Sequence, residues 1–210
     1  MEKEKRSGTR TKKKLISKQK FIKAVGTVLR KEGYQKLGVN RVAEVAGVDK
    51  SSLYYHFGSF DNLLEQYVLA NDYWLGVFQE PINNDGKNLI ESGRDMIIKQ
   101  FEDVMKNEEL QAFLLWELSE NKGIPKYIAG LREEMGREIL HSFNKYFEGS
   151  DVDFEMIAAI LVSSIYYLVL HRNQSSFCNI DISTSRDQKR LKNLIGKITE
   201  LLIPRGSEKD

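Results

Sequence analysis

The sequence Val39–Phe57, VNRVAEVAGVDKSSLYYHF, predicts two short helices joined by a glycine-centred turn. Gly47 stands where the first helix must end, because glycine adopts the left-handed conformation without the steric cost of a Cβ atom. Asn40 is expected to cap the first helix and Asp49 the second, since both side chains can accept hydrogen bonds from free backbone N–H groups. The pattern therefore indicates a helix-turn-helix.

The second helix of this motif has one apolar side and one polar, aromatic side. At about 100° per residue, Leu53 and Phe57 point inward, and Ser51 and Tyr55 lie opposite them. A helix this short is not stable alone in water, so packing must hold it while the polar side faces outward. Such a face is typical of a helix in the DNA major groove, where hydroxyl groups reach base edges or phosphates.

Composition predicts an all-α protein. The chain has 210 residues, enough to bury a sizeable core, and only 3 prolines. Its long segments show helical periodicity and the strand signals are weak. Helices are expected at about residues 14–31, 59–78, 89–106, 108–120, 125–148, 153–171 and 186–203, with a mobile basic arm at 1–13 and a breaker at 81–88.

Charge is distributed unevenly along the chain. Residues 1–60 carry 15 Lys or Arg against 5 Asp or Glu, and the remainder carries 17 against 25. The net charges are +10 and −8, which sum to the formal +2. A basic N-terminal region suits a polyanion, because Lys and Arg contacts to phosphate supply most non-specific DNA affinity. A solvated basic tail explains the charge run equally well, but the adjacent helix-turn-helix favours DNA.

These residues together resemble the TetR family of bacterial transcriptional regulators, over roughly the first third of the chain. In that family a long first helix ends in a Gly-aromatic pair, and the helix-turn-helix ends in a Leu-Tyr-x-(His/Tyr)-Phe signature. Past about residue 75 the resemblance is one of length and helical character only. The matching residues are Gly33-Tyr34, Ala43, Ala46-Gly47-Val48 and Leu53-Tyr54-Tyr55-His56-Phe57.

The resemblance implies a homodimeric repressor that binds a palindromic operator in double-stranded DNA. It divides the chain into a helix-turn-helix domain with a basic N-terminal arm, residues 1–58, and a helical ligand-sensing and dimerisation domain, residues 59–210. Phe60 stands where many members have a phosphate-binding lysine. The expected DNA contacts are Asn40 and Arg41 to backbone or groove edge, Lys50, Tyr54 and His56 to phosphates, and Ser51, Ser52 and Tyr55 nearest the bases. A packed ring is an equally good explanation of His56.

The last two helices are expected to form the dimer interface. Residues 154–170 are apolar on nearly all sides, so we expect a buried helix, and the apolar run of Ile157–Leu170 is shorter than the ~20 residues that cross a bilayer. The family builds a four-helix dimer interface from its last two helices. Packing within one chain is the alternative. The interface candidates are Leu191, Leu194, Ile195, Ile198, Leu201 and Leu202.

The body is expected to bind an unidentified small-molecule effector. Ordinary core packing is the alternative explanation for each aromatic residue in it, and a body that answers to a protein partner is the alternative function. The candidate lining residues lie on the helices that surround such pockets in the family: Phe101, Met105, Phe113, Trp116, Tyr127, Tyr166 and Tyr167.

Nothing in the sequence indicates an enzyme, a cofactor or a metal site. No Gly-rich phosphate loop, metal-binding His-x-x-x-His pair or Ser-centred nucleophile motif is present, and His56, His141 and His171 are far apart. Cys178 is the single cysteine, which excludes an internal disulfide and indicates a reducing compartment. The charged N-terminus lacks the apolar stretch of a signal peptide. We therefore expect a cytoplasmic protein without membrane contact, and an exposed thiol in preference to a redox sensor.

Overall fold

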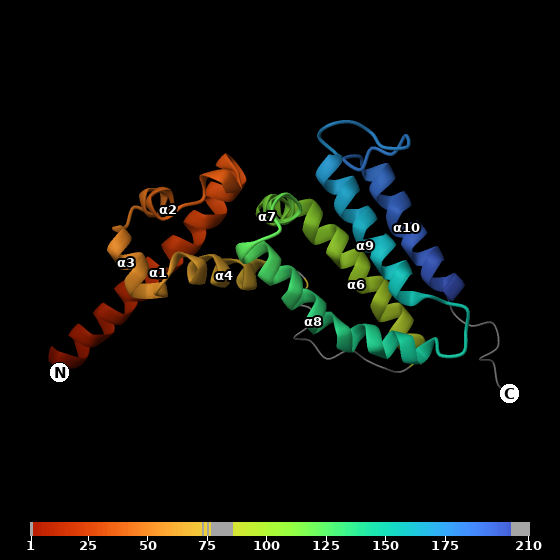
Figure 1. The fold of residues 1–210 in the computed structure, drawn as a ribbon, viewed down its shortest axis with the longest axis horizontal. Coiled ribbons are helices and arrows are strands. Elements are labelled where there is room, and N and C mark those ends of the chain that lie inside the picture. Colours follow the sequence, from red (N-terminus) through yellow and green to blue (C-terminus); the bar gives the residue numbers. More distant parts are fainter. Residues whose placement is uncertain (1, 73, 75, 77–85, 203–210) are drawn as a thin grey trace. The chain divides into compact units, whose positions relative to one another are not determined.

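The computed structural model describes residues 2–72, 74, 76 and 86–202, with side chains from Ser17 to Asp72, at residues 74 and 76, and from Leu89 onward. The regular elements of these residues are all helices, as the sequence predicted (Figure 1). Contacts divide the chain into two units, Met1–Asp72 with Glu108–Leu131, and Tyr73–Asn107 with Arg132–Asp210.

The first unit contains the predicted helix-turn-helix and two further helices that pack with it. Its boundary differs from the expected one after residue 58, because a helix from the middle of the chain joins the N-terminal helices. The assignment of DNA binding to residues 1–58 and of ligand sensing and dimerisation to residues 59–210 stays a prediction. The elements are α1 (Glu2–Glu32), η1 (Tyr34–Lys36), α2 (Val39–Ala46), α3 (Lys50–Phe57), α4 (Phe60–Asn71), α7 (Glu108–Ser119) and the start of α8 (Gly123–Tyr146).

One face of α1 forms the centre of this unit. Phe21, Val25 and Val28 are fully buried, and Leu53 of α3 is fully buried with them. The Phe21 and Phe57 rings meet edge to face, 6.1 Å apart. Each such side chain contributes about 1.5–3 kcal/mol on burial, so this core supplies the stability that α2 and α3 lack as isolated short helices.

Three boundaries in the first unit differ from the sequence predictions. The helix α1 begins at Glu2, whereas an arm was expected over residues 1–13; the side chains of lysines 12–14 lie outside the described ones. The prediction that Asn40 caps α2 was wrong, because the Val42 N–H already donates to the Gly38 carbonyl at 2.9 Å and Gly38 is the N-cap. The helix α4 ends at Asn71, since the backbone of Asp72 is extended.

The second unit contains α6 (Gly86–Lys106), α8 from Arg132 onward, α9 (Phe154–His171) and α10 (Ser185–Leu202). Both α9 and α10 pack on α6. The ends of these helices lie close to the predicted ones, but α6 begins inside the expected breaker at 81–88, of which 81–85 lie outside the described residues.

Aromatic rings pack where α6, α8 and α9 meet. Phe143 stacks on Phe154 with ring centroids 4.1 Å apart, and Phe147 stacks on the same ring at 5.7 Å. Gly93 lets α6 approach this stack, because a Cβ atom there would lie 2.7 Å from Phe143 Cζ. The lack of a side chain at Gly93 is therefore a packing requirement.

The prediction that α9 is a buried helix was wrong for the single chain. Only Ile165 and Val169 are buried in it, whereas Met156, Ile160 and Tyr167 are each about half exposed or more. Length and composition alone would let Phe154–His171 cross a membrane, which for one helix is weak evidence. What the structure establishes is a largely uncovered apolar helix.

Candidate nucleic-acid interface

Two local features define the turn between α2 and α3. Gly47 closes α2 in the left-handed conformation (φ 61°, ψ 37°), and its N–H donates to the Glu44 carbonyl at 3.1 Å. Asp49 then caps α3 by accepting a 2.7 Å hydrogen bond from the Ser51 N–H. Both predictions are confirmed: Gly47 ends α2 and Asp49 caps α3.

Hydrogen bonds from Ser51 also hold the pKa of the Asp49 carboxyl below its ordinary value, with a smaller contribution from the positive charge of Lys50. The carboxylate is therefore ionised and already paired with a helix terminus. This explains how an acidic residue can stand next to a face that we expect to contact phosphates.

The outward face of α3 carries the side chains that the sequence placed there. Leu53 and Phe57 are buried, whereas Tyr55 is 66% exposed and Tyr54 is 50% exposed. Lys50 and Ser51 are exposed as well, and Ser52 is half-buried. The face is thus polar and aromatic, and its contact with DNA stays a prediction.

A concavity of about 500 Å³ lies beside this face, where α2 meets α3. Asn40 and Lys50 line it together with Asp49 and Glu44. The carboxylate of Asp49 is engaged as a helix cap. The side-chain donors that this lining offers to a phosphate are the Asn40 amide and the Lys50 ammonium group. Their positions agree with the roles that the resemblance implies for them.

Arg41 is occupied by other residues of its own chain. Its Nη2 lies 2.8 Å and its Nε 2.9 Å from the two oxygens of Glu32, and its Nη1 lies 2.7 Å from Glu44. The hydrogen bonds with Arg41 lower the pKa of the Glu32 carboxyl below its ordinary value. The fork joins α1 to α2 and occupies three of the five N–H donors of Arg41, which leaves fewer of them for a DNA contact. Such a contact stays a prediction, and the geometry gives Arg41 a structural role.

His56 is half-buried and packed among rings. Its centroid lies 5.2 Å from that of Tyr55 and 6.5 Å from that of Phe21. This packing agrees with the alternative explanation of His56 as a core residue. The phosphate contact stays a prediction.

The sequence missed the support that α7 gives to this site. Trp116 stacks on Tyr34 with ring centroids 6.3 Å apart and planes 12° from parallel. The Trp116 indole donates a 2.6 Å hydrogen bond to Glu120. Trp116 of α7 thus packs against η1, and no local sequence pattern predicts a partner so distant in sequence.

The candidate pocket residues divide between the two units. Trp116 and Phe113 are core residues of the first unit, where their rings meet edge to face at 5.8 Å, and Tyr127 is 49% exposed. In the second unit, Phe101 is buried and Met105 half-buried. The two concavities of about 450 and 500 Å³ have other linings, and a pocket formed by these side chains stays a prediction.

Two tyrosines of α9 complete that set and differ in environment. The Tyr166 hydroxyl accepts hydrogen bonds from the Trp74 indole at 3.1 Å and from the buried Gln100 amide at 3.0 Å. Tyr167 stacks on His171 and is 48% exposed. The first is part of an internal polar cluster and the second lies at the surface.

The six interface candidates on α10 also divide into two groups. Ile195 is buried within its own chain, and Leu202 packs against the cluster around Phe143. Leu191 and Ile198 are half-buried. Leu194 and Leu201 are 53% and 75% exposed, which leaves these two as the candidates best placed to meet a second copy.

Comparison with known proteins places the helix-turn-helix within a family. Residues 22–67 match the family model described as bacterial regulatory proteins, tetR family. The chain is 24% identical over 196 residues to the uncharacterized HTH-type transcriptional regulator YerO of Bacillus subtilis. That match covers 76% of this chain and 66% of the relative, so this chain spans about two thirds of the relative's length.

Solved structures show the same fold over most of the chain. A TetR transcription regulator from Haloarcula marismortui has a TM-score of 0.63 at 16% identity, covering 90% of this chain and 98% of that one. A transcriptional regulator from Aquifex aeolicus has a TM-score of 0.57 at 17% identity, covering 89% and 99%. The agreement extends beyond the helix-turn-helix to the helical body.

Proposed function

Since this chain belongs to the TetR family of transcriptional regulators, we propose that it is a cytoplasmic, non-enzymatic repressor that binds a palindromic operator as a homodimer and leaves it when a small molecule binds the body. The observation that carries this proposal is the face of α3. It presents Ser51, Tyr54 and Tyr55 to solvent while Leu53 and Phe57 are buried.

The chemistry of that face suits DNA. Hydroxyl groups of Ser51 and Tyr55 can donate to or accept from base edges, and the Lys50 ammonium group can pair with a phosphate. The net charge of +10 over residues 1–60 supplies the long-range attraction. Direct base contacts by α3 and phosphate contacts by Lys50 and Asn40 would then provide specificity and register, respectively.

Self-association is supported by uncovered apolar side chains in the second unit. Met156 and Ile160 on α9 are 57% and 59% exposed, and Leu201 on α10 is 75% exposed. A second copy that covers them would remove this surface from water. Two recognition helices related by a two-fold axis would then read half-sites about 34 Å apart.

Release by a small molecule requires two states of the dimer. The effector shifts the equilibrium only by its difference in affinity for the two states. A spacing of the recognition helices that no longer matches the half-sites would lower operator affinity in the bound state.

The test is fluorescence anisotropy of the full chain on a duplex from upstream of its own gene and on a scrambled duplex, across a range of salt concentrations. We expect about 10³-fold tighter binding to the upstream duplex and a steep salt dependence on both. Equal affinity for a panel of upstream duplexes and scrambled ones would contradict a sequence-specific regulator.

A further inference from the structure

The helix α1 is longer than the core that it supports. Its described side chains begin with Ser17, and the first fully buried one is Phe21, whose ring meets that of Phe57 of α3 at 6.1 Å. Residues 2–17 continue the same helix over about 24 Å, at about 1.5 Å per residue. Figure 1 shows this end of α1 running past α3 towards the N-terminus, clear of the other helices of the first unit. The projecting segment thus begins beside the helix that we expect in the major groove.

The projecting segment is strongly basic. Residues 1–17 contain 7 Lys or Arg against 2 Asp or Glu, a net charge of +5. Both acids, Glu2 and Glu4, stand at its start, and no Asp or Glu follows before Glu32. Like charges three or four positions apart destabilise a helix, and this segment lacks the acidic residues that would pair with them along the helix. A polyanion that covers these residues would remove the repulsion.

The basic residues of the segment are in register with the buried face of α1. At about 100° per residue, four of their positions lie within about 60° of the direction of Phe21. These four residues are Lys3, Arg6, Arg10 and Lys14. The side of α1 that is apolar where it packs on the helix-turn-helix is therefore basic where the helix runs on alone.

Lys18 stands where this side of the helix changes from apolar to basic. Its side chain is half-buried, and its Nζ lies 5.5 Å from the centre of the Phe57 ring. Phe57 is the last residue of α3. The basic face therefore starts at the C-terminal end of the expected recognition helix and continues along α1 from there.

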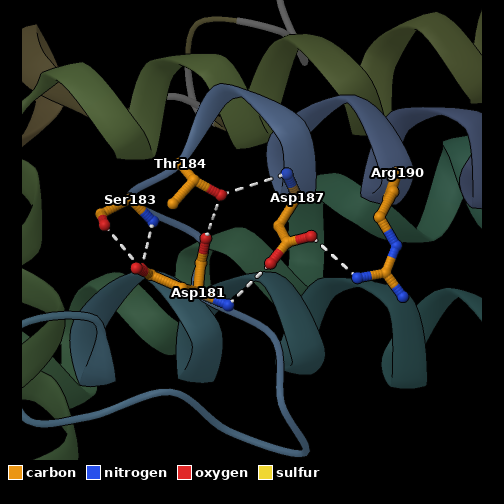
Figure 2. Close-up of polar contacts among 5 residues, drawn as sticks. All are labelled: Asp181, Ser183, Thr184, Asp187 and Arg190. Atoms are coloured by element: carbon orange, nitrogen blue, oxygen red, sulfur yellow. Dashed lines mark hydrogen bonds and ion pairs between the residues drawn. The ribbon is translucent and has the colours of Figure 1, made fainter.

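The basic residues of α10 differ, because carboxylates of their own unit engage them. Arg190 Nη1 lies 2.8 Å from one oxygen of Asp187, and the other oxygen accepts a 2.9 Å hydrogen bond from the Asp181 N–H (Figure 2). Lys192 pairs with Glu102 of α6. These cations contribute to the structure of the second unit. The projecting segment of α1 has no acidic neighbour along the helix after its first turn.

We propose that residues 2–17 of α1 form a second DNA-binding element, which lies along the phosphate backbone beside the half-site that α3 reads. The contacts come from the in-register face of Lys3, Arg6, Arg10 and Lys14. This inference rests on the proposed function and extends its DNA-binding surface beyond the helix-turn-helix. Contacts to phosphates carry no sequence information, so this element adds affinity and fixes the orientation of the first unit on the duplex.

Duplex DNA fits this face better than a membrane surface does. A helix that lies in a membrane interface needs a large apolar face opposite its basic one. Leu15 and Ile16 are the only aliphatic or aromatic residues in residues 2–17. The segment therefore has charge for a polyanion and too little apolar surface for lipid.

The test compares two double variants that remove the same charge from opposite sides of the helix. Arg10→Gln with Lys14→Gln alters the in-register face. Lys5→Gln with Lys12→Gln alters positions that lie about 160–180° from the direction of Phe21. Both variants lower the net charge of the chain equally and leave the core residues unchanged, and thermal melts establish that they are folded. A difference between them in DNA binding therefore reports the geometry of the face.

Fluorescence anisotropy of the full chain across salt concentrations gives the slope of log K against log salt. This slope falls by about 0.9 for each phosphate contact that is lost. We expect Arg10→Gln with Lys14→Gln to lower it by about 2 per chain and to weaken binding to the upstream and the scrambled duplex by the same factor, about tenfold. Lys5→Gln with Lys12→Gln should change the slope by less than about half as much.

Hydroxyl-radical cleavage of the upstream duplex locates the contact. Protection of the backbone next to each half-site should weaken in Arg10→Gln with Lys14→Gln and persist in Lys5→Gln with Lys12→Gln. Protection inside the half-sites should persist in both variants, because α3 is unchanged.

Three outcomes would overturn the proposal. Equal loss of slope in the two double variants would mean that only the net charge matters, and unchanged slopes in both would remove the segment from the interface. Single-stranded RNA bound more tightly than duplex, with the preference lost only in Arg10→Gln with Lys14→Gln, would assign the face to RNA.

A failure of the proposed function has a different signature. Wild type would then bind the upstream and scrambled duplexes equally, which contradicts a sequence-specific regulator. A slope that still falls only in Arg10→Gln with Lys14→Gln would support the basic face of α1 as a DNA-binding element in that case as well.

Discussion

The Tyr67 hydroxyl donates a 2.9 Å hydrogen bond to Glu109 Oε2, although 42 residues separate the two. The same carboxylate lies against α1, since a Cβ atom on Gly26 would be 2.0 Å from that oxygen. Three helices of the first unit, α1, α4 and α7, thus meet at one side chain. The helix-turn-helix is therefore supported by a helix from the middle of the chain.

Tyr67→Phe should lower the free energy of unfolding by about 1–2 kcal/mol, because it removes a hydrogen bond to a charged acceptor beside a 2% exposed ring. Urea denaturation measures the change. Tyr55→Phe is the matched control, since the Tyr55 ring is 66% exposed and should leave stability unchanged. Equal stability of both variants would show that the Tyr67–Glu109 bond contributes nothing.

Gly93→Ala should destabilise the second unit, whereas Gly130→Ala should stabilise the protein. A Cβ at Gly93 would press on the stacked Phe143 ring, at a cost of about 1–3 kcal/mol that exceeds the helix propensity gained. Gly130, in α8, has no heavy atom within 4 Å of the same position, so about 0.5–1 kcal/mol of propensity should appear in full. Thermal melts of the two variants should shift in opposite directions, and a rise in both would contradict the close approach of α6 to Phe143.

Tyr55→Ala should weaken operator binding while changing the melting temperature little, because its ring is 66% exposed on α3. Leu53→Ala, on the opposite side of the same helix, should lower the free energy of unfolding by about 2–5 kcal/mol. Anisotropy and calorimetric melts separate the two effects. A large loss of stability in Tyr55→Ala would remove Tyr55 from the proposed interface.

Leu201→Glu should yield monomers where the unaltered chain forms the proposed dimer, since Leu201 is 75% exposed on α10 and is expected to meet a second copy. Leu118→Glu is the control, because Leu118 is 77% exposed on α7 and lies outside the predicted interface. Multi-angle light scattering gives the mass of each variant. Dimers in both would show that the interface does not include Leu201.

The Glu32–Arg41 pair should contribute stability that is lost in acid. Arg41 lowers the pKa of Glu32 below its ordinary 4.5, so folding favours the ionised carboxyl. The contribution is present above pH 4.5 and disappears as the pH falls through the lower folded pKa. Denaturation of wild type and Glu32→Gln from pH 7 to pH 3 should show a difference that vanishes at the acid end, and a constant difference would mean that the pair does not titrate.

Local sequence was sufficient for the helix-turn-helix. The left-handed Gly47, the cap on α3 by Asp49 and the buried Leu53 and Phe57 are all set by neighbours within a few residues. The remaining helices were predicted for the same reason, because apolar periodicity and breakers act over one or two turns. The exception is the start of α2, where Gly38 and not the nearby Asn40 is the N-cap residue.

Partners far apart in sequence were beyond such reasoning. The stacking of Trp116 on Tyr34 and the hydrogen bond from Tyr67 to Glu109 depend on which helices meet, and long-range packing decides that.

By itself, the sequence determined the kind of protein, its helices and the outward face of α3, because these follow from short-range backbone preferences and residue periodicity. The tertiary structure alone decided that Arg41 pairs with Glu32, that Ile195 packs inward while Leu201 does not, and that Tyr67 donates a hydrogen bond to Glu109. The physical reason is that burial and ion pairing depend on the other surfaces that a side chain meets, and these come from distant parts of the chain.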